Sequence, residues 1–404
     1  MIHVIDAICG SGKSTYILDK MSDDVNKKYL YITPFLSEID ERLPEEVPQL
    51  NFKSPEHNGI GKIESFKQLV HEGQNVSATH KLFSMFTDEI VDIIIKNGYV
   101  LVIDEVVDCV GILPDGFNKS DTQALLEGDF VSVDDEQRGR LCWNEDKYPN
   151  HDGRYKTIRS LCKLNMLYNF KDTFLMWEYP PKLLTMLDEV YVLTYLFESS
   201  DMRCWLDLNE IHFEYVDTQD IGLRDDEDII KEVRNNITLL NNRNLDKLRQ
   251  KETDLSSTWF AKAKKETLDK YKSMLRSCVV TNKVSSSEIF WTTYKDHAYK
   301  LSGAGFASGV NKESDKPSFL PCSLRATNEF DDRVLCMYAM NRYKNPVEVN
   351  YLKENGVSVD SDLFALSELI QFVFRGCIRK NKPMKLFILS KRMRRLFEQW
   401  LGKE

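Results

Sequence analysis

The sequence predicts an α/β protein of two tandem lobes, each a parallel sheet flanked by helices, and two observations carry this prediction. Short runs rich in Val, Ile, Leu and Tyr alternate with amphipathic helical segments over the first half of the chain. Buried strands between helices are typical of a parallel sheet that is covered on both faces. The alternation resumes after an acidic stretch, which indicates a second lobe. A chain of 404 residues with 42% hydrophobic content is long enough for two or three domains.

The first lobe is predicted to span residues 1–216. Its expected strands are residues 3–6, 29–33, 75–79, 99–104 and 189–194, separated by helical patterns such as "KIESFKQLVHEG". Residues from about 106 to 172 interrupt this rhythm with acidic sequence that contains Gly and Asp. We expect this stretch to form an insertion in or after the first lobe, with one helix near "YKTIRSLCKLNMLYNF".

The second lobe is predicted to span residues 233–404. Residues 217–232 are expected to be the linker, because they carry seven acidic residues and follow the strand-like run "IHFEYV". A long polar helical stretch is expected from roughly 226 to 275. The elements expected after it are strands in "SEIFWTTY", "RVLCMYAM" and "MKLFILS" and a helix around "LFALSELIQFVFRGCI".

Composition limits the classes of function. A net charge of −9 excludes a polycation that coats nucleic acid, although a narrow basic cleft is compatible with it. The nine cysteines show no CxxC pair and no Cys/His cluster at zinc spacing, so we expect neither disulfides nor structural zinc. No run approaches the ~18 apolar residues of a membrane span, and the N-terminus begins with a strand-like run. We therefore expect a soluble, cytoplasmic protein with no membrane partner.

The strongest motif is "AICGSGKST", which follows the first expected strand and precedes a helix. In this context the backbone N–H groups around Gly10 and Gly12 can cradle a triphosphate, and the helix expected to start near Ser14 aims its positive end at the phosphates. Lys13 is predicted to contact the β- and γ-phosphates and Ser14 to bind Mg²⁺. Ala7 stands where the pattern has glycine, a position that needs only a small side chain. The predicted nucleotide-binding residues are Gly10, Ser11, Gly12, Lys13, Ser14 and Thr15.

A second motif, "YVLVIDEVVD", places Asp104 and Glu105 at the carboxyl edge of the same predicted sheet. Asp104 is predicted to hold Mg²⁺ through water, and Glu105 to orient and activate the attacking water. This pairing favours hydrolysis, because a small-molecule kinase with a phosphate-binding loop needs no such adjacent glutamate.

The third motif lies in "LSELIQFVFRGCIRKNKP", which is predicted to be one helix. Its expected buried stripe consists of Leu366, Leu369, Ile370, Val373 and Cys377. Gln371, Arg375 and Arg379 form a second stripe on that helix. Two arginines four residues apart repel each other by a few tenths of a kcal/mol on an isolated helix. Their shared face therefore indicates a bound polyanion, and the alternative is a solvated basic face.

Two weaker features have alternatives that the residues leave open. Phe290, Trp291 and Tyr294 could stack on bases at ~1–3 kcal/mol each, although at strand spacing at least one of the first two belongs to the core. A C-terminal basic cluster could contact phosphates or form a solvated helix face. Its members are Lys391, Arg392, Arg394 and Arg395.

Together these motifs resemble those of the superfamily 2 helicases and related translocases over most of the chain. The first two motifs of that family match "AICGSGKST" and "VIDE", and its Thr-Pro motif is similar to "YITPFLSEIDER". Further motifs of its lobes are similar to "VSATHKLF", "VLTYLF" and "LRATNEF". Gln371 and Arg375 match its final motif, whereas Arg379 stands one residue later than the family's second arginine. The compact lobes and "LPCSLRATNEF" also resemble helicase-type ATPases encoded by bacteriophages.

The resemblance implies two RecA-like P-loop NTPase lobes that bind ATP and Mg²⁺ between them. The catalytic residues that it implies are Lys13, Asp104, Glu105, Gln371, Arg375 and Arg379. The nucleic-acid contacts that it implies, which position a strand without reading its bases, are Thr33, Pro34, Thr79, His80, Thr327 and Asn328. The expected function is an ATP-dependent helicase or translocase of phage replication or recombination in the host cytoplasm. It is expected to act on DNA more than RNA, as a monomer or weak oligomer, with replication or recombination proteins as further partners.

Three alternatives stay open at this stage. A motor or nucleotide-gated clamp that does not separate strands would share the nucleotide site, and a pure clamp would show negligible turnover. A P-loop kinase would transfer the γ-phosphate to a small acceptor. A packaging motor would need a nuclease lobe with clustered acidic residues, which the second lobe does not offer.

Overall fold

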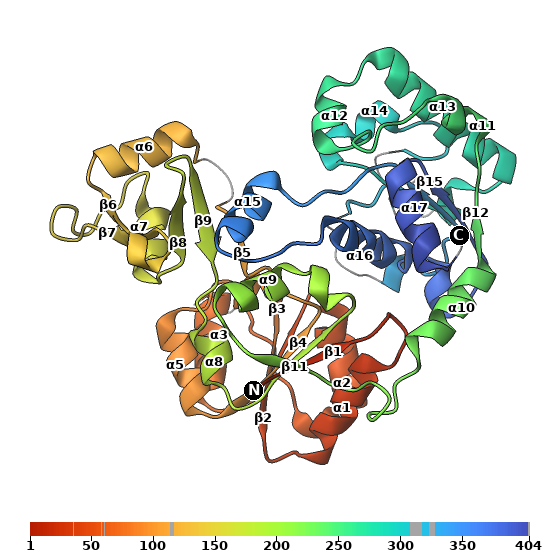
Figure 1. Ribbon diagram of the computed structural model, residues 1–404. Coiled ribbons are helices and arrows are strands. Elements are labelled where there is room, and N and C mark those ends of the chain that lie inside the picture. The colour runs from red at the N-terminus through yellow and green to blue at the C-terminus, as the bar shows by residue number, and fades with distance from the viewer. Residues whose placement is uncertain are drawn as a thin grey trace. The chain divides into compact units, whose positions relative to one another are not determined.

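The computed structural model describes residues 1–34, 36–57, 59, 61–113, 117–307, 317–322 and 328–402, apart from the side chains of residues 246 and 328 (Figure 1). The chain forms two compact units. Unit 1 comprises Met1–Asp6, Lys13–Asp217 and Asn345–Val359, and unit 2 comprises Ala7–Gly12, Thr218–Lys344 and Asp360–Glu404. Each unit contains its own parallel sheet, which confirms the predicted fold class.

Unit 1 is built on a six-stranded parallel sheet in the order β11-β1-β10-β4-β2-β3. Its strands are β1 (Ile2–Asp6), β2 (Lys28–Thr33), β3 (Val76–Thr79), β4 (Tyr99–Asp104), β10 (Val190–Thr194) and β11 (Phe213–Tyr215). Its helices are α1 (Lys13–Asp23), α2 (Leu43–Glu46), α3 (Lys62–His71), α4 (His80–Phe83), α5 (Asp88–Lys96), α8 (Lys182–Met186) and α9 (Asp201–Leu208). All six residues of β4 are buried, as expected of a central strand whose sequence is a continuous apolar run.

The register of the sheet brings the predicted site residues to one edge. Asp6, the last residue of β1, pairs with Thr194 of β10, and Leu193 of β10 pairs with Asp104 of β4. Thr33 of β2 pairs with Thr79 of β3 in the same way. Because all of these strands are parallel, their carboxyl ends meet at a single edge, where ligands bind in open α/β sheets.

The predicted insertion contains an antiparallel five-stranded sheet in the order β5-β9-β8-β7-β6. Its elements are β5 (Val110–Ile112), α6 (Lys119–Glu127), β6 (Val131–Asp134), β7 (Arg140–Trp143), α7 (Lys156–Lys163), β8 (Leu167–Phe170) and β9 (Phe174–Glu178). Helices α6 and α7 lie beside this sheet and share a small core with it, to which Leu125, Trp143 and Ile158 belong (Figure 1). The insertion thus holds two helices, where the sequence predicted one.

Helix α15 (Pro346–Glu354) belongs to unit 1 although it follows a strand of unit 2 in the chain. Tyr351 is buried in the core of unit 1, and its hydroxyl donates to Oε1 of the buried Glu178 at 2.5 Å. The guanidinium of Arg138 donates to the other oxygen of the Glu178 carboxylate at 2.7 Å. The predicted assignment of all of residues 233–404 to the second lobe is therefore wrong for this helix.

Unit 2 is built on a four-stranded parallel sheet in the order β12-β15-β14-β13. Its strands are β12 (Ile237–Leu239), β13 (Ile289–Thr292), β14 (Leu335–Tyr338) and β15 (Met384–Ile388). Its helices are α10 (Asp226–Asn236), α11 (Arg243–Lys247), α12 (Ser257–Lys262), α13 (Lys265–Asn282), α14 (Ala298–Leu301), α16 (Ser361–Val373) and α17 (Lys391–Trp400). The polar stretch predicted as one long helix is divided by β12 and two loops, and the predicted linker contains the start of α10. Among the described residues no helix is long and apolar enough to cross a membrane.

Candidate nucleotide site

The predicted phosphate-binding loop connects β1 to α1. Gly10 and Gly12 adopt φ values of 87° and 103°, which favour glycine over residues with a side chain. Helix α1 begins at Lys13, one residue earlier than predicted, and Lys13 is buried while Ser14 is half-buried. Ala7 is 1% exposed, so the position that carries glycine in the general pattern accepts only a small side chain here.

The loop backbone is held by the stretch that the sequence predicted as a plain linker. The backbone N–H of Arg224 donates to the carbonyl oxygen of Ser11 at 3.0 Å. The backbone N–H of Ile8 donates to Oδ1 of Asp226, in the first turn of α10, at 3.0 Å. Sequence reasoning missed both contacts, because they join residues more than two hundred positions apart. Their partners Arg224 and Asp226 belong to no motif.

Asp104 is a buried carboxylate at the end of β4. Burial, and after it the neighbouring charge of Glu105, raise its pKa to about 6. The hydroxyl of Tyr31 donates to its Oδ2 at 3.0 Å, and the charges of Lys13 and Arg42 also act to lower the pKa. The electrostatic effect of Lys13 on Asp104 supports the prediction that the two motifs form one site.

Glu105 has a φ of 63°, a left-handed conformation that is uncommon outside glycine and Asn or Asp. Its backbone N–H donates to the carbonyl oxygen of Leu193 at 2.8 Å, which fixes this conformation against β10. Strained residues of this kind cost about 1–3 kcal/mol and cluster at functional sites. The left-handed conformation ends β4 directly after Asp104, and the charge of Glu105 still acts on the Asp104 carboxylate.

Arg42 is a site residue that the sequence analysis missed. It closes a π-helical turn, η1 (Glu38–Arg42), and its Nη2 donates to the hydroxyl of Thr15 on α1 at 3.3 Å. Its other nitrogens bind the carboxylates of Glu38, at 3.1 Å, and Glu46, at 2.8 Å. π-helical turns are rare and occur frequently at functional sites. Arg42 is the last residue of the stretch "YITPFLSEIDER", but nothing in its spacing assigned it a role.

The structure describes the side chains of four of the six predicted nucleic-acid contacts. Thr33 is fully buried, which contradicts a direct phosphate contact by its side chain in this conformation, and Pro34 is half-buried. Thr79 caps α4 by accepting from the N–H of Leu82, and Nε2 of His80 lies 3.1 Å from the carbonyl oxygen of Asp104. A cap and a backbone contact are structural roles for these two side chains. Thr327 and the side chain of Asn328 lie outside the described residues.

The predicted single face with Gln371, Arg375 and Arg379 is wrong. Helix α16 ends at Val373, and a turn leads into the 3₁₀ turn Cys377–Lys380. Arg375 is buried, donating to the carbonyl oxygens of Pro321 and Cys322 at 3.3 and 3.0 Å, whereas Arg379 is exposed. The physical reason lies at Gly376, whose backbone is extended with φ −85° and ψ −173°, so the chain has left the helical conformation before Arg379. Glycine is needed there, because a Cβ at this position would lie 2.6 Å from the sulfur of Met384.

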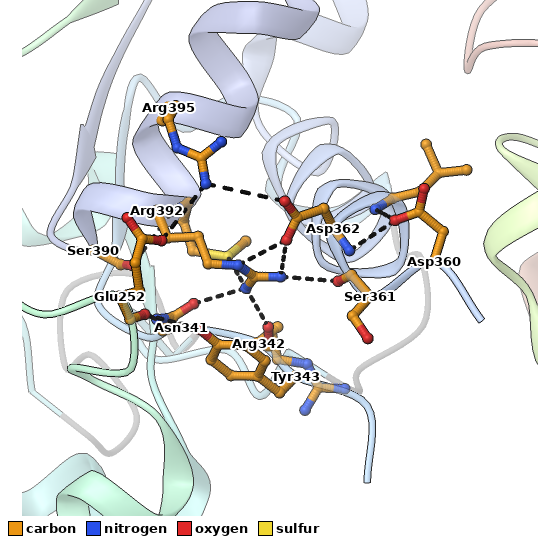
Figure 2. A network of polar contacts seen from close by, with 12 residues as sticks. Glu252, Asn341, Arg342, Tyr343, Asp360, Ser361, Asp362, Ser390, Arg392 and Arg395 are labelled. Atoms are coloured by element: carbon orange, nitrogen blue, oxygen red, sulfur yellow. Dashed lines mark hydrogen bonds and ion pairs between the residues drawn. The ribbon is translucent and has the colours of Figure 1, made fainter. Parts of the chain in front are cut away.

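The C-terminal basic cluster is largely structural. Figure 2 shows Arg392 donating to Asp362, Asn341 and backbone oxygens of neighbouring loops, and it lies 4.2 Å from the ring centroid of Tyr343. Arg394 donates to the carbonyl oxygen of Leu240 at 2.7 Å. These contacts contradict a phosphate-binding role for both arginines.

The predicted stacking aromatics are core residues. Phe290 and Trp291 of β13 are fully buried, so neither ring can stack on a base in this conformation. Tyr294 is half-buried, and its hydroxyl donates to the carbonyl oxygen of Asn341 at 2.8 Å. The expectation that at least one of Phe290 and Trp291 belongs to the core is therefore confirmed, and both do.

Comparisons with known proteins agree with this architecture. A family described as the YonV C-terminal Rossmann-like domain matches residues 231–401, and one described as the YonV middle domain matches residues 116–177. The chain is 29% identical over 425 residues to the SPbeta prophage-derived uncharacterized protein YonV of Bacillus subtilis (strain 168), covering 99% of this chain and 98% of the relative.

Solved structures extend the likeness to the fold. A structure of XPD in its apo form aligns with a TM-score of 0.57 at 12% identity over 99% of this chain and 95% of that chain. S. tokodaii Xpd4 aligns with a TM-score of 0.49 at 12% identity, over 100% of this chain and 94% of that chain. At this identity the XPD match shows the fold alone. The chain therefore has the fold of two tandem RecA-like lobes.

Proposed function

We propose that the protein is an ATP-dependent nucleic-acid helicase or translocase. The observation that carries the proposal is the carboxyl edge of the unit 1 sheet. There Lys13 opens α1 and acts electrostatically on the buried Asp104, and the strained Glu105 follows directly. A lysine beside a carboxylate pair after a glycine-containing loop is the arrangement that binds and hydrolyses a nucleoside triphosphate.

The residues present fit ATP and Mg²⁺. Ser14 offers a hydroxyl at the start of α1 and Asp104 a carboxylate, and both are oxygen ligands of the kind that Mg²⁺ prefers. The pKa of Asp104, raised by burial to about 6, indicates a carboxylate that lacks enough positive charge around it. A bound cation supplies that charge and would polarise the terminal phosphate.

The proposed roles follow from these positions. Lys13 binds the β- and γ-phosphates, and backbone N–H groups of the loop surround them. Glu105 orients the attacking water and accepts its proton, since a carboxylate directly after the predicted Mg²⁺ ligand Asp104 can act as a general base. Arg375 and Arg379 stay candidates for the arginine contribution, and Gln371 stays a proposed catalytic residue beside them. Among these Arg379 is exposed, whereas Arg375 would first have to leave two carbonyl oxygens.

DNA is the proposed polymer and phage replication or recombination the proposed context. The name of the prophage-derived relative supports the context. The test measures ATP hydrolysis with no polymer, single-stranded DNA, duplex or branched DNA, and RNA in parallel. We expect DNA to stimulate hydrolysis most.

Site variants test the chemistry. Glu105→Gln and Lys13→Ala should lower the rate constant of hydrolysis by on the order of 10³-fold or more. Glu105→Gln should retain nucleotide binding, which a fluorescent ATP analogue reports. Hydrolysis by Glu105→Gln at the parent's rate would refute the assignment of the water-activating residue. If the parent binds ATP but does not hydrolyse it, the result would favour the nucleotide-gated clamp. Transfer of the γ-phosphate to a small acceptor would favour the kinase.

A further inference from the structure

Residues 241–283 form a basic segment in an otherwise acidic chain. They carry eleven Lys and Arg against five Asp and Glu, a net charge of +6, while the whole chain has a net charge of −9. The segment contains α11, α12 and α13 of unit 2. A basic segment of this kind is typical of a surface that binds a polyanion. The negative net charge of the whole chain gives no sign of it.

The apolar residues of the segment fix which way its cations face. Leu245 and Leu248 pack against the core of unit 2, and α13 buries Leu268, Tyr271 and Leu275 in the same core. The cations between them are left at the surface. Those classed as exposed include Arg249, Lys251, Lys262, Lys264 and Lys265. Within the described part of the chain none of these five makes an ion pair.

Tyr271 brings the separate pieces of this segment together. Its hydroxyl accepts from Nε2 of Gln250 at 2.8 Å, and its ring lies 5.6 Å from the ring of the half-buried Trp259. Oε1 of Gln250 accepts from the backbone N–H of Lys391, at the start of α17, at 2.8 Å. Lys or Arg residues lie within a few positions of each of these contacting residues in the sequence. We define the Tyr271 surface as Arg249, Lys251, Lys262, Lys264, Lys265, Lys272 and Lys391.

Three of the four acidic residues near this surface make hydrogen bonds or ion pairs within unit 2. Glu252 lies 3.5 Å from Arg395, and its carbonyl oxygen accepts from Asn341 and Tyr343 in the network of Figure 2. Asp254 accepts from the backbone N–H of Lys251, and Glu266 pairs with Lys270 at 2.9 Å. Asp269 is exposed and opposes the positive field. The network of Arg392 therefore anchors the backbone that presents Arg249 and Lys251, and the surface keeps a positive balance.

We propose that the Tyr271 surface binds the phosphodiester backbone of nucleic acid, in addition to any contact made by the motif residues of unit 1. The inference rests on the proposed function for its partner. Lysines act as point charges toward phosphate, and five of the seven cations are exposed lysines on separate short elements, which suits a repeating chain of phosphates. The half-buried ring of Trp259 lies among them and offers a stacking face for a base.

The test compares charge-neutralised variants in DNA binding. The variant combines Lys262→Gln, Lys264→Gln and Lys265→Gln, and the control combines Lys96→Gln, Lys119→Gln and Lys353→Gln, three exposed lysines of unit 1. Fluorescence anisotropy of a labelled oligo(dT) is measured between about 50 and 200 mM salt. We expect the variant to bind on the order of tenfold to a hundredfold more weakly at low salt. Its log–log salt slope should be smaller in magnitude by about 2, since each lost phosphate contact contributes about 0.7.

The outcomes separate this inference from the proposed function. Equal affinity and slope in variant and parent, or an equal loss in the control, would overturn the inference. Loss of binding to an acidic polypeptide but not to oligo(dT) would also overturn it, in favour of a protein partner. Hydrolysis of ATP without polymer should be the same in variant and parent. A parent that binds DNA through this surface but hydrolyses no ATP would refute the proposed function and leave the inference standing.

Discussion

The buried carboxylate of Asp104 should make the metal-free protein less stable at neutral and alkaline pH. Its pKa rises from 3.8 in the unfolded chain to about 6 in the folded one. The folded state therefore binds the proton more tightly, so stability is lost as the pH rises from about 4 to about 6, stays lost above that, and returns as the pH falls. At 1.36 kcal/mol per unit, a shift of about 2 units corresponds to about 3 kcal/mol near pH 8 and to nothing below about pH 4.

Asp104→Asn removes this charge without changing the shape of the side chain, and the amide oxygen can still accept from Tyr31. In EDTA near pH 8 the variant should therefore melt at a higher temperature than the parent. For a unit of this size, about 3 kcal/mol corresponds to roughly 6–12 °C. Calorimetry near pH 8, 6 and 4.5 should show the difference shrinking with the pH. Asp19→Asn, an exposed change on α1, should alter stability by less than about 0.5 kcal/mol. A difference that is absent near pH 8, or constant with pH, would refute the reasoning.

Three further predictions concern residues to which no motif assigned a role. Arg42→Ala should weaken ATP binding on the order of tenfold, because it removes the guanidinium that bonds Thr15 and lowers the pKa of Asp104. Arg42→Lys should restore part of the affinity for ATP in the same titration. Asp226→Ala, which leaves the N–H of Ile8 without its acceptor, should raise the KM for ATP on the order of tenfold, while Asp226→Asn should not. Tyr351→Phe should lower the melting temperature by several degrees, since a hydrogen bond to a buried carboxylate contributes about 1.5–3 kcal/mol.

The parts of the fold that the sequence predicted are those fixed by local pattern. β4 was predictable because a continuous apolar run ending in Asp104 has few alternatives to a central strand. The loop before Lys13 was predictable because glycine spacing and a following helix occur together. Local pattern failed at Arg375: the helix ends at Val373, and the chain turns extended at Gly376, where a Cβ would clash with Met384 of the sheet. No periodicity in the sequence records that contact.

Helix α15 was unpredictable for a different reason. Its sequence reads as an ordinary short helix with an Asn345 cap, and nothing in it specifies which core it joins. Tyr351 contributes to the choice, because its hydroxyl satisfies one oxygen of Glu178 while Arg138 satisfies the other. Burial raises the pKa of Glu178, so loss of either partner would leave a buried carboxylate with an unsatisfied oxygen. Leu352 and Val357 are buried in the same core, so membership of unit 1 follows from tertiary packing and not from the chain order.

The contacts of the phosphate-binding loop bear on how nucleotide occupancy reaches the rest of the chain. The loop backbone at Ile8 and Ser11 is bonded to Asp226 and Arg224, and α10 begins at Asp226 and continues without a break into β12, an edge strand of the unit 2 sheet. Phosphates that draw the N–H groups of the loop inward act on these two hydrogen bonds before they act on anything more distant. The stretch predicted from its composition as a linker is thus bonded to the predicted phosphate-binding loop itself. Asp226→Ala should consequently reduce the stimulation of hydrolysis by DNA more than it reduces hydrolysis without polymer, and equal reductions would show that the bond serves only the shape of the loop.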